Sequence, residues 1–175
     1  MQTPKATTVN LISGTLEYSL SNLIKMSVLS NALDILYTEK VREEKSGTYG
    51  VGVSGRISDF PKGQSILQIY FDTDPALQEE LNTIILNELQ EISEKGISKT
   101  ILATVQENLL KNHQQKIEEN PYWLNVLQTY YDDNLNITDD YISIVSALTT
   151  EDIQQFAQTL LSQGNRIEVA MFPKE

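Results

Sequence analysis

The chain has 175 residues, which is enough for one domain with a sizeable core, and 40% of them are hydrophobic. Its formal net charge of −11 and its pI of about 4.5 argue against a general nucleic-acid-binding role and against docking on an anionic membrane, since both need a basic surface. The chain has no cysteine, which excludes disulfides and thiolate metal sites, and no apolar run is long enough to span a membrane.

The first part of the chain predicts a strand, a long helix and two further strands. Residues 7–13 alternate as a short strand, and residues 17–44 have the apolar spacing of a helix that ends before Ser-Gly-Thr at 46–48. Residues 49–57 and 65–73 have the pattern of two strands, joined by a loop that contains a proline and a glycine.

Three helices are predicted next. Asp74 can cap free backbone amides and Pro75 suits the first helical position, so a helix should begin there and end at Gly96. A second helix is predicted over residues 98–118, and Asn120-Pro121 repeats the signal of a cap followed by proline for a third.

Two shorter helices and a strand complete the chain. Thr138 and Thr149 are the predicted N-caps of these helices, the second of which closes at Gly164, and residues 166–172 alternate as a last strand. Strands near both ends and in the middle, with helices between them, predict an α+β fold. We expect an antiparallel-rich sheet of about four strands with helices packed on one face.

Residues 50–55, GVGVSG, fit the G-x-G-x-x-G pattern of a dinucleotide-binding turn. Such a turn needs a helix directly after the glycines, because the helix N-terminus receives the phosphates. Here the glycines lie within a predicted strand and no helix follows, so nucleotide binding is disfavoured. With a period of two, Gly50, Gly52 and Ser54 share one strand face, which would let another backbone or helix approach closely.

The chain's single histidine, His113, does not predict a metal site or a catalytic triad. A zinc site usually needs two or more imidazole or thiolate ligands, and an H-x-x-E-H motif begun at His113 would need Glu and His where Lys116 and Ile117 stand. The acidic segments lack the spacing of a calcium loop, and no G-x-S-x-G elbow accompanies the serines. We expect His113 on the polar face of a helix and no complete active site in this chain.

Arg42 and Tyr49 are the candidate site residues, and the residues alone leave two interpretations open. The helix dipole favours an arginine near a helix C-terminus, and β-propensity favours a tyrosine at the start of a strand, so a purely structural role is the preferred interpretation. In the other interpretation, the short turn between helix and strand brings both donors to one spot. A guanidinium and a phenol there could hold a peptide carbonyl or stabilise an oxyanion.

Residues 41–51, VREEKSGTYGV, resemble a characteristic segment of the C-terminal half of the insulinase (pitrilysin-like) zinc peptidases, in which a long helix ends in Leu-Arg-Glu-x-x-Gly-x-x-Tyr-x-Val. The spacing of seven between Arg42 and Tyr49 matches. Val41 replaces the leucine, and Ser46 stands where a glycine is common, so we expect the turn to differ in detail from that of the family. The order of elements is similar over nearly the whole chain, most of all to the long bacterial members.

The resemblance implies a two-part enzyme. These peptidases consist of two similar halves that close around a peptide, and the N-terminal half carries the inverted zinc motif, the glutamate base and the zinc. Carried over to this sequence, Arg42 would bind a substrate carbonyl near the scissile bond and Tyr49 would donate to the oxyanion next to zinc. Residues 1–175 are then expected to be one metal-free C-terminal domain, a fragment of a longer chain, that forms one wall of the peptide chamber and is inactive alone.

The expected partners are a zinc-bearing N-terminal half or partner subunit and a peptide substrate, with no nucleic acid, no membrane and no cofactor held by this chain. The resemblance to bacterial members implies the periplasm or cell envelope for the parent protein. One alternative is a non-catalytic family member that acts as a partner subunit or scaffold. A free-standing binding module unrelated to proteolysis is the third hypothesis.

Overall fold

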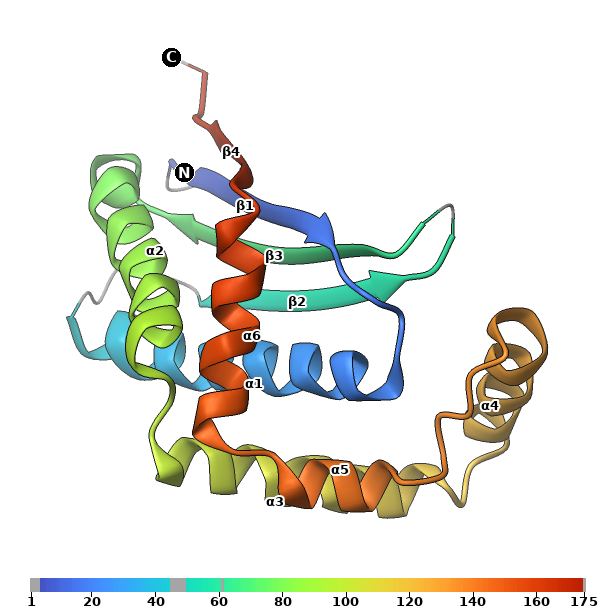
Figure 1. Cartoon of the computed structure of the whole chain (residues 1–175). Coiled ribbons are helices and arrows are strands. Elements are labelled where there is room, and N and C mark those ends of the chain that lie inside the picture. The colour runs from blue at the N-terminus through green and yellow to red at the C-terminus, as the bar shows by residue number, and fades with distance from the viewer. Residues whose placement is uncertain (1–3, 45–49, 61, 175) are drawn as a thin grey trace.

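The computed structural model describes residues 4–44, 50–60 and 62–174, without the side chains of residues 41–44. Within these residues, four strands form one antiparallel sheet in the order β2-β3-β1-β4 (Figure 1). The strands are β1 (Ala6–Thr15), β2 (Val51–Ser58), β3 (Gln64–Thr73) and β4 (Asn165–Met171). Strands near the two ends of the chain therefore pair side by side, with Val9 opposite Val169.

The helices form two layers on the same side of the sheet (Figure 1). The inner layer contains α1 (Leu20–Glu44), α2 (Gln78–Lys95), which follows a short 3-10 turn η1 (Pro75–Leu77), and α6 (Thr150–Ser162). Beyond α1 lie α3 (Lys99–Lys116) and α5 (Tyr141–Ala147), side by side. The helix α4 (Asn120–Asp133) stands at the end of this outer layer.

The hydrophobic core lies between the sheet and the inner helices. Leu67, Ile69 and Phe71 of β3 have no exposed surface, and they alternate with residues that point to the other face, as a strand with one covered face requires. The α1 side chains Leu29 and Leu33 are fully buried in the same cluster. The predicted α+β fold with helices on one face is therefore confirmed.

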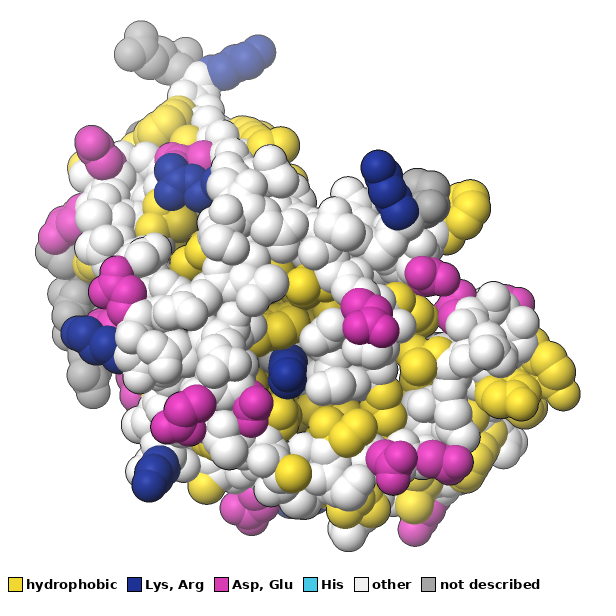
Figure 2. Space-filling view, in the orientation of Figure 1, with side chains coloured by type: hydrophobic (Ala, Val, Ile, Leu, Met, Phe, Trp, Pro, Cys, Tyr) yellow, Lys and Arg dark blue, Asp and Glu magenta, His cyan; other side chains and the backbone are white. Residues whose placement is uncertain are grey.

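The described residues leave two apolar surfaces uncovered. Val169 of β4 and Tyr70 of β3 lie on the sheet face opposite the helices and are partly exposed. Figure 2 shows a second group of exposed hydrophobic side chains over α4, where Trp123, Leu124 and Tyr131 are exposed. In the described part of the chain, no helix is long and apolar enough to cross a membrane.

Three predicted helix starts are confirmed by their capping hydrogen bonds. Asp74 Oδ1 accepts from the Ala76 amide at 2.8 Å, and Ser98 Oγ accepts from the Ile101 amide at 3.1 Å. Thr149 forms a capping box at the start of α6. These starts were predictable because each of the three side chains bonds to an amide only two or three residues away.

Two predicted caps are wrong. The N-cap of α4 is Glu119 rather than Asn120, and no side chain bonds to its first amides. Before α5, the Asn136 carboxamide oxygen accepts from the amides of Thr138 and Asp139, so an Asx turn occupies the segment where Thr138 was expected to begin a helix. The helix begins later, after Asp140 in the left-handed region at φ 62°.

Candidate functional site

The predicted site pair belongs to the junction between α1 and β2. Arg42 lies in the last turn of α1, but its side chain is outside the described residues, as is all of Tyr49. Strand β2 begins at Val51. The order of helix, short connection and strand that the hypothesis requires is thus present, and the prediction that the two side chains face one spot stays a prediction.

The C-terminal half of α1 is held against α2 by two polar contacts. The fully buried Tyr37 donates its phenol hydrogen to the Ile85 carbonyl oxygen at 2.9 Å, and burial raises the pKa of Tyr37 far above its usual value. Lys40 forms an ion pair with Glu88, which is largely buried. Both contacts come within five residues of Arg42, so they fix the helix backbone that carries this residue.

A glycine allows β2 to pack closely on α1, but it is Gly55 rather than the predicted Gly50 and Gly52. A Cβ at Gly55 would lie 2.5 Å from Met26 Sδ and 2.6 Å from Ser30 Oγ, so α1 packs closely on β2 at Gly55. The prediction that the Gly50, Gly52 and Ser54 face permits close approach is therefore wrong, since Gly52 and Ser54 point to the exposed side. Gly50 serves another purpose, because its φ of 125° is a conformation that favours glycine.

The glycine segment 50–55 lies mostly within β2, which is followed by the antiparallel strand β3. A dinucleotide turn requires a helix directly after the glycines, and none follows here. Metal-ligating side chains do not gather either. Within residues 4–44, 50–60 and 62–174, apart from the undescribed side chains, no three His, Asp or Glu residues are grouped as a metal site.

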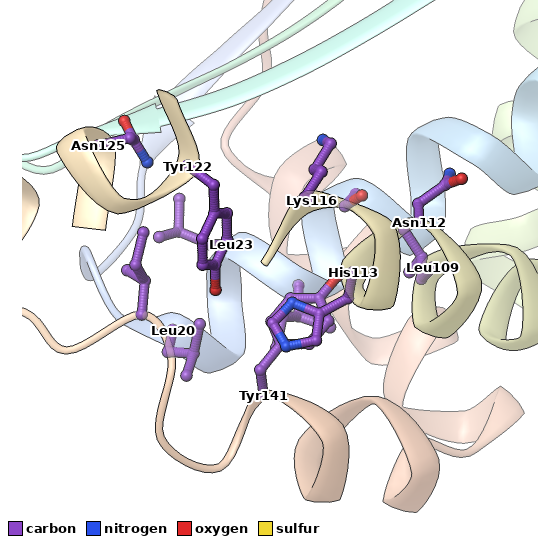
Figure 3. A pocket seen from close by; sticks show the side chains of 12 residues that line it. Leu20, Leu23, Leu109, Asn112, His113, Lys116, Tyr122, Asn125 and Tyr141 are labelled. Carbon is purple, nitrogen blue, oxygen red and sulfur yellow. The ribbon is translucent and has the colours of Figure 1, made fainter. Parts of the chain in front are cut away.

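A cavity of about 310 Å³ lies between α1, α3, α4 and the start of α5, far from the junction (Figure 3). Its apolar wall includes Leu20 and Leu23 from the first turns of α1 and Leu109 from α3. Its polar wall includes Asn112, His113 and Lys116 of α3, Tyr122 and Asn125 of α4, and Tyr141 of α5. Ser27 is the last α1 residue on the wall, and the fifteen residues from there to Arg42 correspond to roughly 22 Å along the helix axis.

Three aromatic rings meet at this cavity. The His113 ring stacks on Tyr141 with ring centres 4.3 Å apart and meets Tyr122 edge-on at 5.8 Å. Burial lowers the pKa of His113 and raises the pKa of both Tyr122 and Tyr141. The prediction that His113 lies on a polar helix face is therefore wrong: the side chain is half-buried among aromatic rings.

This cavity was not predicted, because its walls come from four separate segments of the chain. One signal was present. Leu109, Asn112, His113 and Lys116 recur at intervals of three and four, so they share one face of a helix. That face mixes apolar and polar residues, and sequence alone does not show which other helices pack against it.

Comparison with known proteins identifies the family. The family described as "Peptidase M16 inactive domain" matches residues 5–109, which include β1, α1, β2, β3 and α2. No curated protein matches the sequence.

Solved structures share the fold. The periplasmic protease PqqL from Escherichia coli is similar over 98% of this chain, with a TM-score of 0.80 and 21% identity. A protease from Helicobacter pylori is similar over 98% of this chain, with a TM-score of 0.75 and 15% identity. The peptidase M16 inactive domain from Pseudomonas fluorescens is similar over 97%, with a TM-score of 0.73 and 14% identity. The chain spans 19% of the PqqL chain and 42% and 41% of the other two, in that order.

Proposed function

Because this chain belongs to the peptidase M16 inactive-domain family, we propose that it is the metal-free, substrate-gripping half of a zinc-dependent endopeptidase. In this family the zinc belongs to the catalytic half. The chain would form one wall of a peptide chamber, with zinc and general base supplied by a separate half or by a partner subunit. The observation that carries the proposal is the α1–β2 junction, which lies inside the matched residues and bears Arg42 and Tyr49.

The two side chains suit different moments of peptide cleavage. The guanidinium of Arg42 offers several donors in a fixed plane and would bind a substrate carbonyl near the scissile bond in the ground state. The phenol of Tyr49 would donate to the oxyanion that forms when the scissile carbonyl is attacked. A donor aimed at developing charge in a water-poor site stabilises the transition state more than the substrate. The contacts of Tyr37 and Lys40 with α2 support this arrangement by fixing the end of α1.

The test is kinetic and uses the assembled enzyme that contains the zinc-bearing half. We expect Tyr49→Phe to lower kcat by about 10²-fold with little change in KM, because one oxyanion donor is lost. Arg42→Gln should mainly raise KM. Tyr130→Phe removes a hydroxyl from an exposed α4 tyrosine and should leave both constants unchanged. An unaltered kcat for Tyr49→Phe, with zinc bound and the fold intact by circular dichroism, would refute the proposed role.

The alternative function is that of a non-catalytic partner subunit or scaffold. The same assay separates it from the first. In that case the assembled protein would bind peptide or partner with no cleavage that depends on zinc, and Tyr49→Phe would affect binding at most.

A further inference from the structure

We infer that the cavity between α1, α3, α4 and α5 is a binding site for a small carboxylate with an apolar, ring-bearing body, such as the C-terminal aromatic residue of a peptide. The inference does not depend on the roles proposed for Arg42 and Tyr49. It follows from three properties of the cavity, which are its size, its apolar and aromatic walls, and its polar groups that lack partners.

Size and wall chemistry define the body of the ligand. A volume of about 310 Å³ is at the lower end of the range for small-molecule sites and suits a single ring with a short chain. Leu20 and Leu23 provide an apolar surface on α1, and the ring of Tyr122 meets His113 edge-on beside the stacked pair of His113 and Tyr141, so the three rings form one aromatic wall (Figure 3). Aromatic walls favour a flat ring, which they can meet edge-on or offset.

The polar groups define the head of the ligand. The Tyr122 hydroxyl oxygen is buried and has no hydrogen-bond partner among the described residues, which is costly unless an acceptor enters the cavity. Lys116 adds a positive charge and makes no ion pair with any described residue. Asn112 and Asn125 add amide donors to the wall.

The charge of the wall is opposite to that of the whole chain. Asp and Glu make up 24 of the 175 residues and the net charge is −11, yet none of the residues that line this cavity is acidic. A cationic ligand would meet Lys116 with no carboxylate to balance it. An anionic head group is therefore the complementary one, and a carboxylate can accept hydrogen bonds from both an ammonium and a hydroxyl.

The experiment uses the 175-residue chain, whose only histidine lies in the cavity wall and whose only tryptophan, Trp123, contacts Tyr122 with ring centres 5.4 Å apart. The proton resonance of the His113 ring and the fluorescence of Trp123 therefore report on the site directly. The probes are 3-phenylpropionate, the cation 3-phenylpropylamine, and the tripeptide Ala-Ala-Phe with either a free carboxylate or a C-terminal amide. We expect a saturable shift with 3-phenylpropionate and at least about ten-fold weaker binding of the amine.

Comparing the tripeptide with 3-phenylpropionate shows whether the site takes peptide C-termini or free small acids. Tighter binding of Ala-Ala-Phe than of 3-phenylpropionate, lost in the amide, assigns the site to peptide C-termini. Binding of 3-phenylpropionate without the tripeptide assigns it to free small acids. Either result supports the site.

Three variants test the contacts. Tyr122→Phe removes only the unpartnered hydroxyl and Lys116→Gln removes only the charge, and each should weaken binding of 3-phenylpropionate by about ten-fold. Lys111→Gln, on α3 but outside the cavity wall, is the matched control and should change the affinity by less than about two-fold. Equal binding of acid and amine, no saturable shift with any probe, or equal losses for Lys111→Gln and Lys116→Gln would each overturn the inference.

Discussion

Gly55 determines how closely α1 can pack on β2. A methyl group there would overlap Met26 Sδ and Ser30 Oγ, both of which belong to buried parts of α1. We expect Gly55→Ala to lower the free energy of unfolding by about 1–3 kcal/mol, because a packed interior must shift to admit the extra carbon. Urea denaturation followed by circular dichroism measures this loss.

Gly52→Ala is the matched control on the same strand. A Cβ there would come no closer than 3.8 Å to the Tyr70 ring, so we expect a change within about 0.5 kcal/mol. If the two variants had equal stabilities, the close contact between α1 and β2 would not be the reason for glycine at position 55.

His113 should titrate below its ordinary value of about 6.5, because burial disfavours its charged form. As the pH falls through 6.5, His113 becomes protonated in the unfolded chain while it is still neutral in the folded one. The free energy of unfolding should therefore decrease in that window and become constant below the lowered pKa. The single histidine resonance gives the folded midpoint directly, and the same measurement in urea gives the reference. A folded midpoint at or above the urea value would contradict the burial seen here.

At the level of elements, α6 depends on its capping box. Thr149 Oγ1 accepts from the Asp152 amide at 3.2 Å, and Asp152 Oδ2 accepts from the Thr149 amide at 2.9 Å. We expect Thr149→Ala to cost about 1 kcal/mol of stability, measured by thermal or urea unfolding. Thr159→Ala, at an exposed position within the same helix, should be neutral or slightly stabilising, since alanine is the better helix former. Equal losses in the two variants would argue against the cap.

The Thr149 hydroxyl, followed by the Thr149 amide, holds the pKa of Asp152 below its usual value. The stability that this carboxylate contributes should therefore be complete above the usual pKa of aspartate and be lost as the pH falls through the lowered one. The cost of Thr149→Ala should shrink over the same acidic range.

The elements could be predicted from the sequence where local signals determine them. The helical spacing of apolar residues in α1 and the alternation of buried and exposed residues in β3 each extend over many residues. The side chains of Asp74, Ser98 and Thr149 accept hydrogen bonds from amides two or three residues away. The starts of α4 and α5 were misassigned for different reasons. At α4 no side chain bonds to the first amides, so the Asn120-Pro121 pattern is not backed by a capping hydrogen bond. At α5, Asn136 accepts from the amides of Thr138 and Asp139 in an Asx turn, and the helix begins only after Asp140.

The candidate sites were less predictable, for a physical reason. Arg42 and Tyr49 were found only through resemblance to a family motif, because each residue also suits its local element. The cavity could not be predicted at all, since its walls come from four helices and the sequence does not show how α4 is placed relative to α3, which brings Tyr122 to His113. The close approach at Gly55 likewise depends on which strand face α1 covers, and a period of two does not reveal that choice.

At the scale of the whole molecule, the fold has helices on one face of the sheet and leaves the opposite face and β4 uncovered by the described residues. The chain belongs to the peptidase M16 inactive-domain family and spans 19% of the longer PqqL chain whose fold it shares. In the proposed function it is one part of a larger enzyme. The exposed Val169 and Trp123 lie on the surfaces that such an assembly would be expected to contact.

A reconstitution assay tests whether this chain completes a zinc-dependent peptidase. The 175-residue chain and the zinc-bearing half of its parent or partner are assayed for cleavage of a fluorogenic peptide, each alone and then together, with and without a chelator. We expect no cleavage by either part alone, cleavage by the mixture, and loss of that cleavage when zinc is removed or when Tyr49→Phe replaces the native chain. Cleavage by this chain alone, or cleavage by the zinc-bearing half at the same rate whether or not this chain is present, would contradict the proposed function.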